Sequence, residues 1–101
     1  MRISDELMSE AVVTWIGWGY GPYPQPSDER VVAKYGEEFA LDALPRIRAL
    51  YESFYMSDAG NTTHGLAEMG RKATADFRPL HPELSDAAIA ALSWCYTWDY
   101  K

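Results

Sequence analysis

Apolar residues recur every three or four positions along most of the chain, which is the spacing of one face of an α-helix. In the first segment, Leu7, Ala11 and Trp15 follow Ser4 at this spacing. A serine followed by acidic residues is typical of a helix start, because its hydroxyl accepts a backbone amide and the acids suit the positive end of the helix dipole. The sequence therefore predicts a first helix that ends near residue 16, with a strand over 12–18 as the minor alternative.

A segment rich in glycine, proline and aromatic residues, residues 17–26, then interrupts the helical pattern. It holds three of the seven glycines and three of the six prolines of the chain. Neither a helix interior nor a central strand tolerates this composition. We expect a loop that either folds back as a lid over the helix ends or presents its rings to a partner, and both roles can coexist.

The helical pattern resumes after this loop and predicts four more helices. Serines start two of them, an acidic pair starts a third, and a threonine is expected to cap the remaining one. The expected ranges are about 27–36, 37–55, 62–77 and 85–98, with caps at Ser27, at Thr62 or Thr63, and at Ser85.

Two features modify this pattern. Pro45 is expected to kink or divide the third helix near residue 43, because its ring clashes with the carbonyl four residues earlier. Gly65 and Gly70 each weaken the fourth helix by about 1 kcal/mol relative to alanine, although their smallness permits close helix contact. Five helices with short connections predict an all-α fold, a small bundle or an orthogonal array, formed by a single domain over residues 1–101.

Charge and composition narrow the classes of partner. The chain has 9 Lys and Arg against 15 Asp and Glu, a net charge of −6, so too few cations are free to contact the phosphates of a nucleic acid. A basic protein is a better match. The acidic start does not resemble a secretory signal, no apolar run is long enough to cross a membrane, and Cys95 has no disulfide partner, so we expect a cytoplasmic location.

Two groups of residues suggest chemistry, and each has a simpler interpretation. His64 and Glu68 are four positions apart on one helix face and could bind a metal with His81 and Glu83, but such pairs are common and the second histidine of a zincin motif is missing. Cys95 could be a nucleophile with either histidine as base, yet its apolar surroundings are typical of a buried structural cysteine. We expect no metal, no cofactor and no catalytic residue.

The surplus of aromatic residues gives the candidate site. Rings lie at or beyond the ends of the helical stripes, in the loop after the first helix and at the end of the last, where full burial is hardest. We expect the two groups to meet and, with nearby acids, to form a partner-binding surface. Its expected residues are Trp18, Tyr20, Tyr23, Asp28, Glu29, Trp98, Asp99 and Tyr100.

These observations favour a non-enzymatic protein-binding domain. Its most concrete form is a small cytoplasmic inhibitor, of the immunity or antitoxin type, that neutralises a basic toxin or nuclease. One alternative is a small-molecule or metal-binding helical domain that uses His64, Glu68 and the aromatic loop. Another is a self-associating structural protein whose tryptophans and tyrosines form the core of a homodimer.

Overall fold

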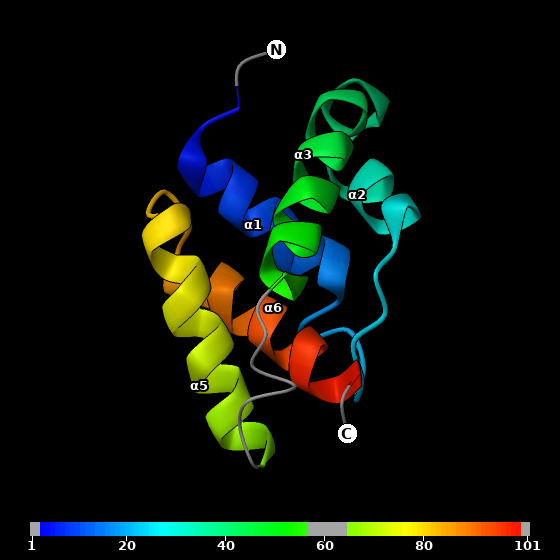
Figure 1. The fold of residues 1–101 in the computed structure, drawn as a ribbon. Helices are drawn as coiled ribbons and strands as arrows, with labels where there is room; N and C mark the ends of the chain where they lie inside the picture. Colours follow the sequence, from blue (N-terminus) through cyan, green and yellow to red (C-terminus); the bar gives the residue numbers. More distant parts are fainter. Residues whose placement is uncertain (1–2, 57–64, 100–101) are drawn as a thin grey trace.

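The computed structural model describes residues 3–56 and 65–99, and within these ranges it is helical and has no strand. The fold is a small all-α array, as the sequence predicts (Figure 1). The elements are α1 (Asp5–Ile16), α2 (Asp28–Tyr35), α3 (Glu37–Tyr55), α5 (Leu66–Phe77), the 3-10 turn η1 (Arg78–Leu80) and α6 (Asp86–Asp99).

The helices cross one another instead of running as a parallel bundle (Figure 1). α6 packs between α1 and α5, and α3 contacts each of these three helices as well as α2. Aromatic side chains fill the centre, where the Phe54 ring lies 5.0 Å from that of Phe77 and 5.5 Å from that of Tyr96. All three side chains are buried, so the core joins α3, α5 and α6.

Serine caps begin three helices, which confirms the predicted starts. The hydroxyl oxygens of Ser4, Ser27 and Ser85 each accept a hydrogen bond from the backbone N–H three residues later, at 3.1, 3.3 and 3.1 Å. Each bond satisfies one of the amide groups that a helix leaves without an internal partner. The boundaries of α1, α2 and α6 therefore follow from local sequence.

The predicted division of the third helix at Pro45 is wrong, because α3 runs unbroken from Glu37 to Tyr55. The proline removes the amide that would bond to the carbonyl of Leu41, and both residues are exposed, so water can replace the missing donor. No helix among the described residues is both long enough and apolar enough to span a membrane.

α5 begins at Leu66, and its N-cap is Gly65 with a φ of 88°, a backbone conformation that favours glycine. The predicted caps Thr62 and Thr63 lie outside the described residues. Gly70 faces α6 closely, since a Cβ atom on it would lie 3.0 Å from Ser93 Oγ. The close helix contact expected from the small size of this glycine is therefore confirmed.

Candidate functional site

The loop between α1 and α2 completes the end of α1. The last four carbonyl groups of an α-helix have no partner within the helix. Here all four accept hydrogen bonds from residues that follow the helix. The carbonyl of Val13 pairs with Gly17 and Trp18, that of Thr14 with Arg30, that of Trp15 with Ser27 and Arg30, and that of Ile16 with Gln25.

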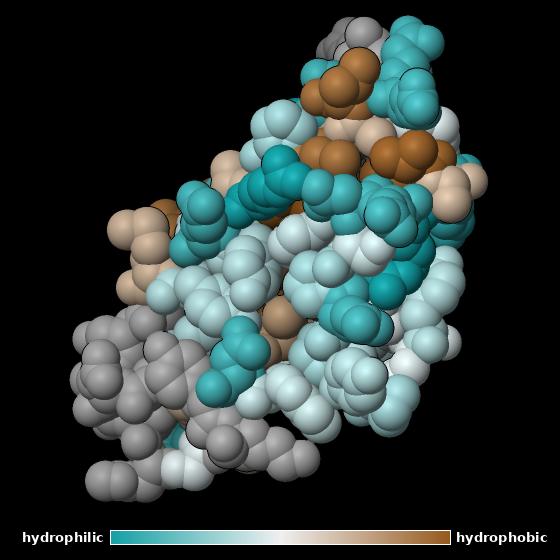
Figure 2. Space-filling view, turned by 90° about the vertical axis from the view of Figure 1, so that its right-hand side faces the viewer, coloured by the Kyte–Doolittle hydropathy of each residue, from teal (hydrophilic) through white to brown (hydrophobic). Residues whose placement is uncertain are grey.

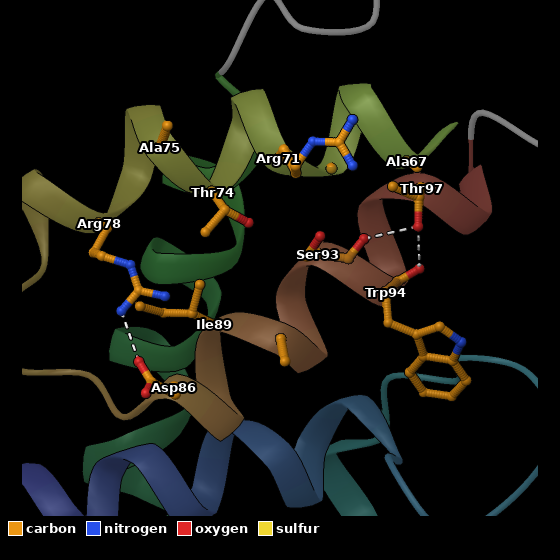
Figure 3. A pocket seen from close by; sticks show the side chains of 12 residues that line it. Ala67, Arg71, Thr74, Ala75, Arg78, Asp86, Ile89, Ser93, Trp94 and Thr97 are labelled. Atoms are coloured by element: carbon orange, nitrogen blue, oxygen red, sulfur yellow. Dashed lines mark hydrogen bonds and ion pairs between the residues drawn. The ribbon is translucent and has the colours of Figure 1, made fainter. Parts of the chain in front are cut away.

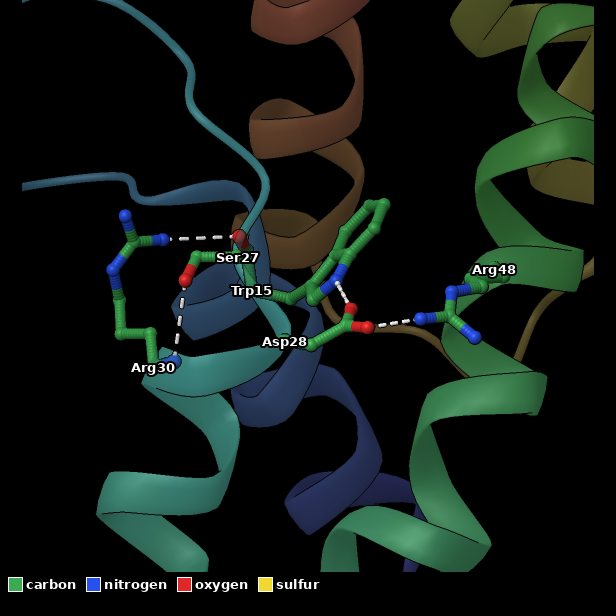
Figure 4. Close-up of polar contacts among 5 residues, drawn as sticks. All are labelled: Trp15, Ser27, Asp28, Arg30 and Arg48. Atoms are coloured by element: carbon green, nitrogen blue, oxygen red, sulfur yellow. Dashed lines mark hydrogen bonds and ion pairs between the residues drawn. The ribbon is translucent and has the colours of Figure 1, made fainter.

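Arg30 is the side chain that fixes this loop. Its Nη1 donates to the carbonyls of Thr14 and Trp15 at 2.9 and 3.0 Å, and its Nη2 donates to the carbonyl of Gln25 at 3.1 Å. Figure 4 shows the guanidinium reaching back to the end of α1 from the first turn of α2. One charged group therefore ties α1, the loop and α2 together, and charged donors make stronger hydrogen bonds than neutral ones.

Gly17 and Tyr20 lie next to the Arg30 guanidinium. Gly17 has a φ of 94°, and a Cβ atom on it would lie 2.9 Å from Arg30 Nη1. The Arg30 guanidinium also lies over the Tyr20 ring, 4.9 Å from its centroid, at a distance suited to a cation–π contact. The glycine is therefore required both for backbone conformation and for room beside the arginine.

Asp28 joins three helices at the other side of the loop (Figure 4). Trp15 Nε1 donates to Asp28 Oδ1 at 2.9 Å, and Arg48 of α3 pairs with Asp28 Oδ2. The Trp15 ring meets the Tyr51 ring edge-on at 5.3 Å. Asp28 and Glu29 were both predicted to contact a partner. Asp28 instead uses both carboxylate oxygens within the protein, whereas Glu29 is exposed.

The loop and the end of α6 meet through their rings, as the sequence predicts. Trp18 lies edge-on to Trp94 with centroids 5.0 Å apart, and the rings of Tyr23 and Trp98 are 6.1 Å apart. Each ring keeps a large exposed part: 48% of Trp18, 59% of Tyr20, 47% of Tyr23 and 38% of Trp98. We call these four residues the aromatic surface.

The face of the protein that carries the loop and α2 has two regions of different hydropathy (Figure 2). Its lower part is mostly pale, and brown atoms gather towards the end where α2 and α3 meet. At that end an apolar hollow of about 300 Å³ is lined by Val32, Ala40, Leu41 and Leu44, and Leu41 is 79% exposed. This apolar patch shares no residue with the aromatic surface.

The remaining predicted residues lie at the end of α6. The Tyr55 hydroxyl donates to Asp99 Oδ2, so this carboxylate also has a partner within the protein. Tyr100 and His64 lie outside the described residues, and Glu68 is exposed on α5. Among the residues that are described, no three histidine, cysteine or carboxylate side chains gather as a metal site.

Cys95 is buried, as expected, and its sulfur lies 3.7 Å from the Tyr55 hydroxyl oxygen. Burial raises the pKa of the Cys95 thiol above its ordinary value. Burial also raises the pKa of Tyr55, and its hydrogen bond to Asp99 adds to that shift. A thiol held in its neutral form is a poor nucleophile, which fits a structural role for this cysteine.

These pKa shifts predict that the protein loses stability at alkaline pH. The unfolded chain releases the thiol proton near pH 8.5 and the tyrosine proton near pH 10, roughly the values of free side chains, whereas the folded chain keeps both protons to higher pH. Above about pH 8.5 the unfolded state therefore binds fewer protons, and the free energy of unfolding falls as pH rises. Urea unfolding at pH 7.5, 9 and 10 measures this fall.

Cys95→Ala is the matched variant for that measurement. It is less stable at neutral pH because it leaves a small cavity, but it lacks the part of the fall that begins near pH 8.5. The later part remains, because it comes from Tyr55 and from Tyr35 and Tyr51, whose pKa values are also raised by burial. A wild-type stability that stays constant up to pH 10 would contradict the assignment of these raised pKa values.

A polar chain that the sequence does not reveal connects α3 to the segment after η1. Ser53 Oγ lies 3.2 Å from His81 Nε2, and His81 Nδ1 lies 3.2 Å from Glu83 Oε1, while the imidazole ring stacks on Phe77 at 4.6 Å. The order resembles a nucleophile, a base and a carboxylate. However, Ser53 lies in the last turn of α3, where the helix carbonyls disfavour the negative charge of an acyl-transfer intermediate. We interpret the chain as a tether between the two segments.

The aromatic surface is the feature of the described residues that sequence reasoning anticipated and that the fold assembles from separate segments. Comparison of the chain with protein-family models, curated proteins and solved structures finds no match.

Proposed function

We propose that this chain is a non-enzymatic protein-binding domain that recognises its partner through the aromatic surface. The observation that carries the proposal is that four partly exposed rings are held in place before any partner arrives. Trp and Tyr are enriched among the residues that dominate binding energies. Rings that are already ordered lose little conformational entropy on binding, so more of their contact energy contributes to affinity.

A basic partner fits the charge of the chain. Its net charge is −6, and Glu29 lies exposed at the start of α2, the helix that follows the aromatic loop. Opposite charge accelerates association and makes it sensitive to salt. The specific form that we propose is a small cytoplasmic inhibitor that covers the active surface of a basic toxin or nuclease, as immunity proteins and antitoxins do.

The test begins with the partner that co-purifies with the tagged chain from its native cells. We expect Trp18→Ala, Tyr20→Ala and Trp98→Ala each to weaken binding by about 2 kcal/mol, roughly 30-fold, while unfolding midpoints stay near that of the wild type. Isothermal titration calorimetry measures the affinity, and urea unfolding measures the stability. Raising the salt concentration should also weaken the complex.

Leu41→Ala is the control, because Leu41 is a large exposed apolar residue in the separate patch on α3. It should leave affinity unchanged. If the ring variants bind normally, or lose affinity only in proportion to lost stability, the recognition surface lies elsewhere. If the co-purifying partner is a second copy of the chain, and ring substitution dissociates it, the homodimer alternative replaces the inhibitor.

A further inference from the structure

A groove between α5 and α6 is lined mostly by small side chains, unlike the aromatic surface. It has a volume of about 940 Å³ and is bordered by small side chains from both helices (Figure 3). Gly70 and Thr74 contribute from α5, Ala90 and Ser93 contribute from α6, and the buried Ile89 also lines it. Small side chains leave the two helix backbones accessible to a third element that packs along them.

Arg71 of α5 and Arg78, the first residue of η1, give this groove a positive wall. Arg71 and Arg78 line it, although the chain as a whole carries a net charge of −6. Arg71 is exposed, and none of the ion pairs among the described residues involves it. Arg78 pairs with Asp86 at 2.7 Å, but the side chain of that aspartate is 90% exposed. A surface ion pair of this kind contributes at most about 1 kcal/mol, so Arg78 can exchange its partner.

The spacing of the arginines matches a helix. They are seven positions apart, with Arg71 within α5 and Arg78 directly after its last residue, where the backbone is still helical, and seven residues of a helix rise about two turns or roughly 10.5 Å. A helix that lies along α5 would place acidic residues at the same interval opposite them. The groove is long and open, and its small side chains suit the 8–10 Å separation of packed helices. Trp94, which also lines the groove, would contact an apolar residue of that helix.

We propose that the α5–α6 groove binds an amphipathic helix of another protein, which carries acidic residues seven positions apart on its contact face. The apolar residues between them would pack on Ile89 and Ala90. This goes beyond the aromatic surface, because the groove is lined by other residues and selects an acidic segment instead of a basic one. The −6 net charge repels acidic segments in general, so specificity must come from the two arginines.

A selection experiment tests this with a defined probe. A displayed library of 18-residue helical peptides has a fixed apolar stripe and randomised flanking positions, and it is selected against the full chain. We expect Asp or Glu to be enriched at two positions seven apart. Selection against the double variant Arg71→Glu, Arg78→Glu should instead enrich Lys or Arg at those positions. The best wild-type peptide should bind that variant at least ~10-fold more weakly, which corresponds to about 1.4 kcal/mol.

Two further variants locate the binding. Arg46→Glu replaces an exposed arginine on α3, outside the groove, and should change the affinity by less than about 2-fold. Ala90→Trp fills the groove from an exposed position and should abolish binding. The proposal is wrong if no peptide is enriched, if the enriched peptides have no acidic pair, or if they bind the glutamate double variant equally well. Tyr20→Ala and Tyr23→Ala change the aromatic surface at residues that do not line the groove, and they should leave peptide binding intact, so the two proposals fail separately.

Discussion

Replacing Phe54 with alanine is expected to lower the free energy of unfolding by about 3–5 kcal/mol. The Phe54 side chain is fully buried, and its ring contacts both Phe77 of α5 and Tyr96 of α6. Alanine would leave a cavity where three helices meet, and the rigid neighbouring rings can only partly close it. A domain of this size has a total stability of about 5–15 kcal/mol, so a large share of it depends on this one ring.

Urea unfolding followed by circular dichroism measures the loss, and the melting temperature should fall by more than about 12 °C. Met56→Ala is the control, because Met56 is nearby in sequence and 84% exposed, so its stability should change by less than about 0.5 kcal/mol. A loss below about 1.5 kcal/mol for Phe54→Ala would show that this ring is not at the centre of the core.

Replacing Arg30 with methionine is expected to lower the free energy of unfolding by about 2–4 kcal/mol. Methionine keeps much of the side-chain volume but removes the guanidinium that donates to the carbonyls of Thr14, Trp15 and Gln25. The carbonyl of Thr14 would lose its donor from α2, and a buried polar group without a partner costs about 1–3 kcal/mol. The contact over the Tyr20 ring would also be lost.

Arg30→Met is also expected to loosen the loop between α1 and α2, so that its aromatic rings are no longer fixed in position. In NMR spectra we expect the largest chemical-shift changes at the backbone amides of Gly17, Tyr20 and Gln25, with smaller changes in α5. Arg46→Met is the matched control, since Arg46 is exposed, and it should leave both stability and spectra nearly unchanged. Equal effects of the two substitutions would contradict the role assigned to Arg30.

Local signals in the sequence were sufficient to predict most of the helices. The caps Ser4, Ser27 and Ser85 act within three residues, so their effect can be inferred from neighbouring positions alone. The division of the helix at Pro45 was wrongly predicted because the consequence of a missing amide depends on whether the carbonyl that loses it faces solvent. That depends on which face of α3 is buried, and Leu41, whose carbonyl loses the amide, lies on the exposed face.

The candidate site was predictable only in part. The meeting of the loop with the end of α6 was expected because both segments hold more rings than one core can bury. The contacts of Asp28 within the protein could not be predicted, because its partners Trp15 and Arg48 lie 13 and 20 positions away, on two other helices. The α5–α6 groove was missed for the same reason, since it requires Arg71 and Ala90 to face the same space.

The hydrogen bonds at the end of α1 require the following segment to keep its length. Prolines and glycines usually mark connections where insertions are harmless and where a tag, a fused domain or a new chain terminus can be placed. In this protein an added or deleted residue between Gly17 and Gln25 would move the amides of Gln25 and Ser27 away from the carbonyls that they serve. For protein engineering, this segment is therefore a poor insertion or permutation site, despite its composition.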